Sequence, residues 1–370
     1  MTWIYHQPTR IHFGLGCRAK IAELAGALGK RPMLVTDRAL RQLDGVSALG
    51  RALGPAAKIF SEVEPNPTVA AVDALVKLIG DEQADVLVAV GGGSALDCAK
   101  AAGAIALQGG AARHYHSEGR ALDARRLPLI AVPTTAGTGS EVTPIAVLDD
   151  VEKKIKAPLA HPSLFPTSAV IDPELTVSMP GHVTAATGLD ALAHALEGYW
   201  SKNHQPICDL LACEAARLVF QHLPTAFNEP QNLAAREGMC RAALLGGMAF
   251  QLPKNAAVHA CSFPLSSRYH LPHGAACALT LDAFIRFNAP ALGERGAQLA
   301  RAAGFADLGA LAEAVAELKK NTGLPARLRD IGVTAADLGW LVESSFHPLM
   351  NNNPRPVSPA ELRALYASIL

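Results

Sequence analysis

The sequence predicts a chain of two parts, an α/β half built on a parallel sheet followed by an all-helical half. Up to about Met179, short runs rich in β-branched residues alternate with helical stretches. From Pro180 onward, Ala- and Leu-rich segments repeat their apolar residues every three or four positions, as helices do. A length of 370 residues is enough for two domains. We place these domains at residues 1–180 and 181–370.

Four strands are expected in the first half, each a short apolar run that ends at a turn or a polar residue. They are Pro32–Thr36, Ala84–Val90, Leu127–Pro133 and Ser168–Ile171. Because helical segments separate them, they predict a parallel, Rossmann-like sheet with helices on both sides. Five long helices are expected in the second half, at Val183–Trp200, Cys208–His222, Asn232–Phe250, Leu308–Lys320 and Pro359–Ile369.

Composition excludes several classes of partner. The formal net charge is zero and no run of Lys or Arg stands out, which argues against nucleic acid or an anionic membrane as the main partner. No stretch reaches the roughly 20 apolar residues of a membrane span, and the N-terminus lacks the apolar segment of a signal peptide. The seven cysteines never form a CxxC pair and are typical of reduced core thiols (Cys17, Cys98, Cys208, Cys213, Cys240, Cys261 and Cys277). We therefore expect a cytoplasmic protein.

A glycine loop, Gly91–Lys100, follows the second expected strand and opens a helix. Glycines let backbone N–H groups approach a ligand closely, and a helix N-terminus offers partial positive charge to a pyrophosphate. Ser94 followed three residues later by Asp97 resembles a capping box. An ordinary tight turn between strand and helix has the same appearance, so the loop alone leaves both interpretations open.

Two further features lie at the ends of expected strands. Asp37 ends the first strand, where a carboxylate can accept hydrogen bonds from a ribose diol and repel a 2′-phosphate; this favours NAD over NADP, although Asp is also a common turn residue. The loop Pro133–Glu141 carries Thr134, Thr135 and Thr138 after the third strand. The carboxyl ends of strands are where open α/β sheets bind ligands.

A possible metal site lies in the second half. Asp190 and His194 are four residues apart and therefore share one helix face. Both lie among apolar residues, where their burial needs a compensating partner; a hydrogen bond between them would suffice. His259 lies in an apolar helix, and His273 stands between Pro and Gly. One carboxylate and three imidazoles together suit Fe(II) or Zn(II), and the choice between these metals stays open.

In their order and spacing these segments resemble the iron-containing alcohol dehydrogenase family along almost the whole chain. The resemblance is carried by Phe13-Gly14 with Asp37, Glu64–Thr68, Gly91–Lys100, Pro133–Glu141, Asp172-Pro173, Thr187–Glu197 and the stretch from His259 to Gly274.

The resemblance implies an N-terminal dinucleotide-binding domain and an all-α metal-binding domain in a dehydroquinate synthase-like fold, assembled as a homodimer or a larger homo-oligomer. It assigns the metal to Asp190, His194, His259 and His273. It assigns NAD contacts to Asp37, Asn66, Gly92, Gly93, Ser94, Asp97, Thr134, Thr135, Thr138 and Lys156.

One position departs from the family pattern. Many members carry another histidine four residues after the third metal ligand, and this chain has Phe263 there. Proton transfer would then use water, a ribose hydroxyl of the cofactor or another residue such as His270. Arg268 and His270 could favour a substrate with an anionic tail, or they could simply face solvent.

The implied activity is that of a metal-dependent, NAD(H)-linked alcohol dehydrogenase or aldehyde reductase. Hydride would pass between the nicotinamide and a primary alcohol or aldehyde bound to the metal. One alternative is a reductase of an anionic carbonyl compound of the phosphonoacetaldehyde, semialdehyde or maleylacetate type. A metal-dependent lyase or cyclase of the dehydroquinate synthase type is disfavoured by the largely apolar ligand region. A non-catalytic nucleotide-binding protein is disfavoured by the complete ligand set.

Overall fold

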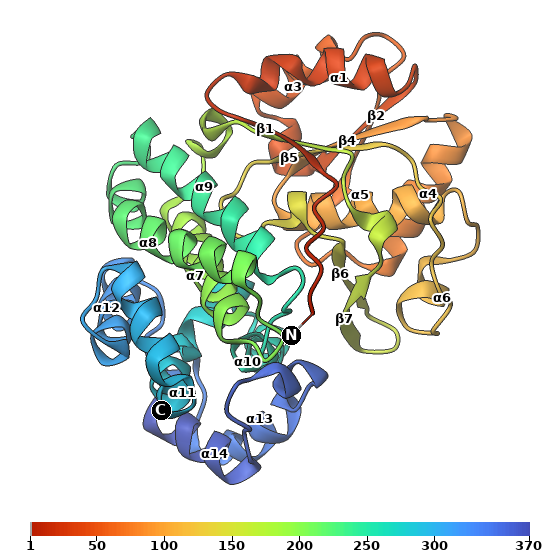
Figure 1. Cartoon of the computed structure of the whole chain (residues 1–370). Helices are drawn as coiled ribbons and strands as arrows, with labels where there is room; N and C mark the ends of the chain where they lie inside the picture. Colours follow the sequence, from red (N-terminus) through yellow and green to blue (C-terminus); the bar gives the residue numbers. More distant parts are fainter. Residues whose placement is uncertain (1) are drawn as a thin grey trace. The chain divides into compact units, whose positions relative to one another are not determined.

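The computed structural model describes residues 2–370, which form two compact units (Figure 1). The α/β unit comprises residues 6–135 and 140–176. The helical unit comprises residues 2–5, Ala136–Gly139 and Val177–Leu370. The segment Ala136–Gly139 therefore belongs with the helices, although Thr134 and Thr135 alone separate it from a strand of the other unit.

The α/β unit is built on six parallel strands in the order β1-β8-β5-β4-β2-β3. Their bounds are β1 Arg10–Phe13, β2 Pro32–Asp37, β3 Lys58–Val63, β4 Val86–Gly91, β5 Leu129–Pro133 and β8 Ser168–Ile171. The predicted fold class is confirmed. β1 and β3, absent from the prediction, are the two edge strands, and their partly exposed residues lack the continuous apolar run of a buried strand. A separate antiparallel hairpin joins β6 Ile145–Asp150 to β7 Ile155–Ala160.

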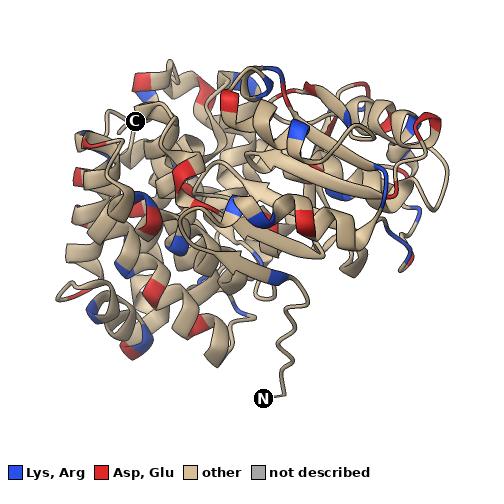
Figure 2. Ribbon diagram, turned by 90° about the horizontal axis from the view of Figure 1, so that it is seen from above, with Lys and Arg blue, Asp and Glu red and all other residues tan. Residues whose placement is uncertain are grey.

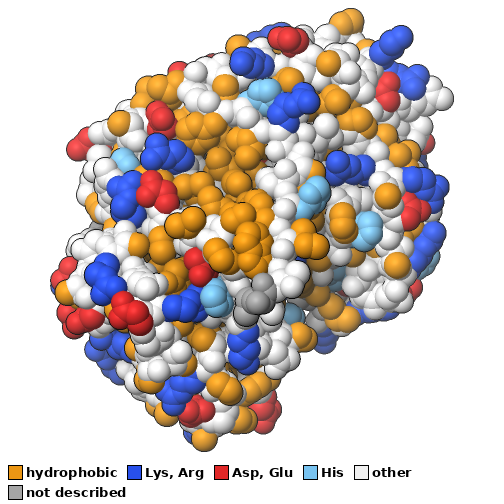
Figure 3. Space-filling view, viewed as in Figure 1, with side chains coloured by type: hydrophobic (Ala, Val, Ile, Leu, Met, Phe, Trp, Pro, Cys, Tyr) orange, Lys and Arg blue, Asp and Glu red, His pale blue; other side chains and the backbone are white. Residues whose placement is uncertain are grey.

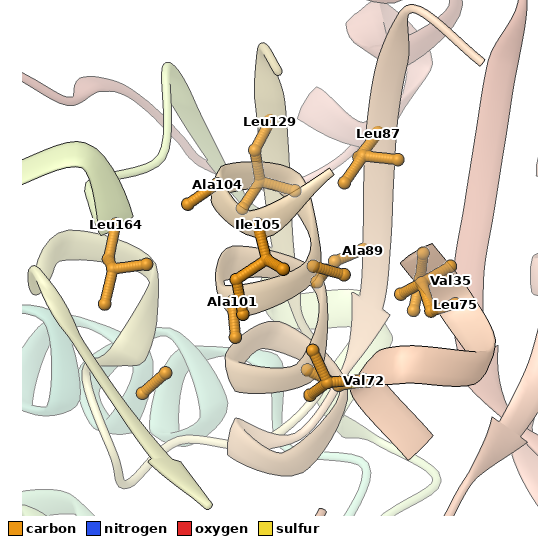
Figure 4. Close-up of a cluster of buried hydrophobic side chains, with 14 of the residues drawn as sticks. Val35, Val72, Leu75, Leu87, Ala89, Ala101, Ala104, Ile105, Leu129 and Leu164 are labelled. Atoms are coloured by element: carbon orange, nitrogen blue, oxygen red, sulfur yellow. The ribbon is translucent and has the colours of Figure 1, made fainter. Parts of the chain in front are cut away.

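Helices cover both faces of this sheet. Successive side chains of a strand point to opposite faces, so Leu87 of β4 packs toward α4 (Val69–Asp81) and α5 (Gly93–Ile105), as Figure 4 shows. Its neighbour Val88 packs toward α1 (Ile21–Leu28) and α3 (Asp44–Ala52) on the other face. The short helices of this unit are α2 Arg38–Arg41, α6 Ala112–His116, and the 3-10 turns Cys17–Lys20, Ser140–Val142, Pro162–Leu164 and Pro173–Thr176.

The strand order reverses between β2 and β4. From β2 the chain moves to β3 at one edge, and from β4 it moves to β5 in the opposite direction. The loops that leave β2 and β4 therefore diverge, and open α/β sheets bind ligands in the crevice at such a switch point. Asp37 ends one of these strands and Gly91 ends the other.

The helical unit contains all five helices that were predicted for it. Its helices are α7 Gly181–Trp200, α8 Pro206–Asn228, α9 Leu233–Phe250, α10 Ala257–Tyr269, α11 His273–Ala303, α12 Leu308–Asn321, α13 Leu338–Ser345 and α14 Pro359–Ser368, with 3-10 turns at Leu328–Ile331, Ala335–Asp337 and Pro348–Asn352. α11 has a non-helical residue at Gly293 and contains Pro290. α7 is buried on almost every side from Thr184 onward, which is typical of a central helix.

Charges are mixed over the molecule. Acidic and basic residues are scattered over the ribbon (Figure 2), and both signs occur around the hydrophobic side chains on the face seen in Figure 3. All seven cysteines are free thiols. Within residues 2–370, no helix has both the length and the apolar character that a bilayer crossing requires.

Candidate active site

The centre of the helical unit brings together the four predicted metal ligands. α7 carries Asp190 and His194 on one face, with only 2% and 4% of their surfaces exposed. The His194 ring stacks on Phe250 of α9, with ring centroids 4.2 Å apart and planes within 11°. Water therefore cannot solvate this carboxylate and imidazole, and other groups must compensate their burial.

Gly274 brings the start of α11 against α7. A Cβ atom at this position would lie 2.1 Å from the Ala186 carbonyl oxygen and 2.9 Å from Asp190 Cβ. Only glycine permits this approach, and it places the preceding residue, His273, beside Asp190. The His273 Nε2 atom lies 3.8 Å from Asp190 Oδ1. The Pro–His–Gly sequence thus directs this histidine inward.

Glu197 positions the remaining histidine. Its side chain is fully buried on α7; one carboxylate oxygen accepts the Val258 N–H at 2.7 Å and the other contacts His259 Nδ1. With Nδ1 held in this way, Nε2 of His259 faces the other ligands. A carboxylate behind a ligating histidine fixes the orientation of its ring and raises its basicity. No role was predicted for Glu197, although it follows His194 by three residues and so lies on the same face of α7.

The donor atoms converge on one point. His259 Nε2 lies 3.0 Å from His194 Nε2 and 3.8 Å from Asp190 Oδ1. Within residues 2–370, Asp190 Oδ1 is buried without a hydrogen-bond partner. The side chain of His273 is 34% exposed, whereas that of Asp190 is 3% exposed. Asp190, His194 and His259 are thus buried, and His273 is the ligand of this set that reaches solvent.

The electrostatics of the cluster suit a cation. Burial, with a smaller contribution from Glu197, raises the pKa of Asp190 to about 6. Burial, together with His259 and His273, holds the pKa of His194 well below its ordinary value. A divalent ion would stabilise both the charged carboxylate and the neutral imidazole lone pairs. One carboxylate and three imidazoles form a donor set that fits Fe(II) or Zn(II).

In the α/β unit, the glycine loop Gly91–Lys100 contacts Thr134 and Thr135, which begin the threonine loop Pro133–Glu141. The Thr134 N–H donates to the Gly91 carbonyl at 3.0 Å, and a Cβ on Gly92 would lie 3.3 Å from Thr135 Cγ2. Helix α5 begins at Gly93 with Gly92 as its N-cap and no side-chain cap. The predicted capping role of Ser94 is therefore wrong. The Ala95 and Leu96 N–H groups donate to the Gly92 carbonyl at 3.1 and 3.3 Å. The N–H groups of Gly93 and Ser94, at the very start of the helix, are therefore the ones that could donate to an anion.

Three predicted cofactor residues from distant segments meet beside this loop. Lys156 of β7 donates through Nζ to Asn66 Oδ1 at 2.8 Å, and the Asn66 N–H donates to Ser94 Oγ at 3.3 Å. Asn66 adopts a left-handed φ of 59°, which Asn tolerates better than most residues. The loop after β3 is thereby attached to the start of α5.

Other predicted cofactor residues make contacts within the protein. Asp97 is buried, accepts hydrogen bonds from Ser140 Oγ at 2.5 Å and Val147 N–H at 2.8 Å, and pairs with Lys100 at 3.3 Å. Asp37 caps α2 by accepting the Leu40 N–H at 2.8 Å. Asp97 thus holds α5 to the end of the loop Pro133–Glu141 and to β6.

Thr138 belongs to the helical unit, within the segment Ala136–Gly139. That segment packs tightly there, because a Cβ on Gly139 would lie 2.4 Å from Gly247 Cα of α9. Gly139 has a φ of 60°. Glycine is thus required at this position by both its backbone conformation and its contact with α9.

The three predicted pocket residues lie in different surroundings. Phe263 follows His259 by one turn of α10, and its ring centroid is 5.0 Å from that of His347. Arg268 is paired with Asp337 at 2.9 Å and lies over the Trp340 ring at 4.4 Å. His270 is exposed and ends α10 with a left-handed φ of 54°.

His347 was not predicted from the sequence. Burial lowers its pKa, and its Nδ1 accepts the Leu349 N–H at 3.2 Å. His347 thus adds an imidazole beside the turn of α10 that bears Phe263.

Comparison with known proteins decides the family. Residues 8–173 match the model of the iron-containing alcohol dehydrogenases, and residues 184–370 match that of the C-terminal domain of the Fe-containing alcohol dehydrogenase family. The chain belongs to the iron-containing alcohol dehydrogenase family. The predicted resemblance is thus confirmed. The chain is an oxidoreductase that acts on CH–OH donors and interconverts alcohols and carbonyl compounds.

Relatives of this family member cover its whole length. It is 36% identical to the 1,3-propanediol dehydrogenase of Klebsiella pneumoniae, over 98% of this chain and 97% of that protein. It is 32% identical to the NAD-dependent methanol dehydrogenase of Bacillus methanolicus, over 100% of both. Among solved structures, the sulfoacetaldehyde reductase of Bifidobacterium kashiwanohense in complex with NAD+ has a TM-score of 0.96 and 43% identity, over 100% of this chain and 99% of that one.

Proposed function

We propose that the chain is a metal-dependent, NAD(H)-linked alcohol dehydrogenase or aldehyde reductase whose metal is held by Asp190, His194, His259 and His273. The observation that carries the proposal is the convergence of these four buried or half-buried donors around the unpartnered Asp190 Oδ1. A bound Fe(II) or Zn(II) ion supplies Lewis acidity to a substrate oxygen. The protein supplies a dry, preorganised ligand set and an opening beside His273.

The α/β unit is proposed to bind NAD(H) at the switch point of its sheet. The Gly93 and Ser94 N–H groups at the start of α5, the adjacent threonines and the Asn66–Lys156 pair would hold the diphosphate and the sugars. Asp37 ends β2 and favours NAD over NADP through its negative charge. The proposed contacts are Asp37, Asn66, Gly92, Gly93, Ser94, Thr134, Thr135, Thr138 and Lys156, with Asp97 acting through the segment that it anchors. NAD(H) supplies the hydride carrier.

A primary alcohol or aldehyde is the proposed substrate class, and an anionic aldehyde is a second candidate. The high similarity to a sulfoacetaldehyde reductase favours the second candidate. Arg268 adds little to this second candidate, because its guanidinium is already paired with Asp337 and lies over the Trp340 ring. Turnover of propanal and turnover of sulfoacetaldehyde, both measured with the same enzyme and NADH, distinguish the two candidates.

Substitution Asp190→Ala tests the proposed metal site. The variant is expected to lose bound metal, measured by elemental analysis, and aldehyde-dependent NADH oxidation, while NADH binding measured by fluorescence is retained. Glu313→Ala, which removes an exposed carboxylate from α12, is the matched control. Full activity in a verified metal-free Asp190→Ala protein would contradict the proposal. Metal and NADH binding without turnover of any aldehyde would instead favour a lyase-like or binding-only role.

The proposal extends to the organisation of the protein. We take residues 1–180 as the NAD-binding domain and residues 181–370 as the metal- and substrate-binding domain. Seven free thiols support a reducing, cytoplasmic location. A homodimer or a larger homo-oligomer is expected from the family, and sedimentation equilibrium tests it.

A further inference from the structure

Cys277 lies one helical turn after His273 on α11, on the same side of that helix. Its side chain is fully buried, and its Sγ atom lies 3.8 Å from His273 Nε2. Composition alone placed this thiol among the ordinary core cysteines. Its position beside a metal ligand sets it apart from the other six.

One ligand atom each from Asp190, His259, His273 and Cys277 can be chosen so that all four lie within 4.8 Å of one another. Two donor atoms that each lie about 2.0–2.3 Å from the same ion are at most about 4.6 Å apart, whatever the coordination geometry. Small side-chain adjustments therefore bring this thiol into the coordination sphere. His194 completes the cluster from the side of His259, 3.0 Å from its Nε2.

From this geometry we propose that Cys277 Sγ is a further donor of the metal site and biases the site toward Zn(II) over Fe(II). The inference rests on the metal site of the proposed function. When the sulfur–metal bond forms, the S–H bond breaks, the sulfur keeps the electron pair and the proton leaves to solvent; nothing is oxidised or reduced. A thiolate is a soft donor, and soft donors favour Zn(II), whereas harder oxygen donors suit other divalent metals.

Cobalt substitution tests the sulfur ligand directly. The Co(II)-loaded protein is expected to show an intense near-ultraviolet charge-transfer band from thiolate to metal, and Cys277→Ser is expected to abolish it. Cys98→Ser, which changes a buried thiol of the α/β unit, is the matched control and keeps the band. Circular dichroism verifies the fold of both variants. A band that is absent from the unmodified protein, or unchanged in a folded Cys277→Ser protein, would overturn the proposal.

Competition between metals tests the predicted preference. Apoprotein dialysed without oxygen against equal concentrations of Zn(II) and Fe(II) is expected to take up mainly Zn(II). In Cys277→Ser the Zn-to-Fe ratio is expected to fall, because the soft sulfur donor that favours Zn(II) is replaced by a harder oxygen. An unchanged ratio would overturn the preference for zinc.

X-ray absorption on the unmodified, zinc-loaded chain decides the matter if Cys277→Ser does not fold. A sulfur shell at about 2.3 Å supports the proposal, and a shell of nitrogen and oxygen alone overturns it. The latter result would leave the proposed dehydrogenase intact, because metal is still bound. Failure to bind any metal would overturn both proposals.

Discussion

Glu197 shows how a residue that touches no substrate can control the proposed metal site. Its two oxygens contact the Val258 N–H and His259 Nδ1, so one buried carboxylate links α7 to the first turn of α10. Such supporting carboxylates typically change metal affinity by about 10- to 100-fold when they are lost. Glu197 is therefore a positioning residue. Its loss should lower the affinity for metal more than it lowers the stability of the fold.

Glu197→Gln keeps the shape of the side chain and removes its charge. The variant is expected to bind Zn(II) about tenfold more weakly, because a neutral amide no longer strengthens the His259 ligand. Metal titration with a competing chelator measures the change. Glu317→Gln, an exposed change on α12, serves as the control. Equal Zn(II) affinities in Glu197→Gln and the unmodified chain would show that Glu197 only anchors the start of α10.

At the scale of elements, the close approach of α7 and α11 builds the site. Gly274 permits this approach, since a Cβ there would meet the backbone of α7 rather than a movable side chain. Backbone atoms of a buried helix cannot yield without shifting the helix that carries them. The position of His273 beside Asp190 is thus a result of helix packing.

Gly274→Ala is expected to displace the first turn of α11 and weaken metal binding, with a loss of stability of about 1–3 kcal/mol from overpacking. Thermal unfolding and metal content are the measurements. Gly26→Ala is the matched control: Gly26 lies in α1 with no atom within 4 Å of an added Cβ, so alanine should stabilise that helix by up to about 1 kcal/mol. A Gly274→Ala protein with unchanged stability and metal content would contradict this account.

At the scale of the whole molecule, Glu141 makes stability depend on pH. It is buried in the α/β unit, and burial raises its pKa to about 7, although Lys100 acts in the opposite direction. The same carboxyl titrates near pH 4.3 in an unfolded chain. Between these two values the folded protein keeps a proton that the unfolded chain has lost. Stability therefore falls as pH rises through this window, and below it the effect is absent.

Glu141→Gln cannot ionise and is expected to lose less stability than the unmodified chain as the pH rises from about 4 to about 7. Urea midpoints measured across this range for both proteins isolate the contribution of one carboxyl, because all other groups titrate alike. Glu23→Gln, on the exposed side of α1, should follow the unmodified chain. Parallel pH profiles for Glu141→Gln and the unmodified chain would rule out a raised pKa at this site.

Prediction from sequence succeeded where the signal is local. The buried strands β2, β4, β5 and β8 are continuous apolar runs, whereas the edge strands β1 and β3 are half exposed and lack that pattern. α10 contains Pro264 and α11 contains Pro290, and a proline within a helix makes its bounds hard to predict from the sequence. The surroundings of Arg268 could not be predicted either, because its partners Asp337 and Trp340 lie about 70 residues away in the chain.

The sequence by itself determined the α/β-then-helical order, the glycine and threonine loops, the family and four candidate metal ligands. The order of the two halves and the loops follow from periodicity and motif spacing, which the chain sets locally. The family and the assignment of the four ligands follow from the resemblance that those motifs carry. Only the tertiary structure decided that Glu197 supports His259, that Gly274 carries His273 to Asp190, and that Cys277 lies among the ligands. Those facts depend on how α7, α10 and α11 pack against one another. Contacts between residues of different helices cannot be predicted from the spacing of those residues along the chain.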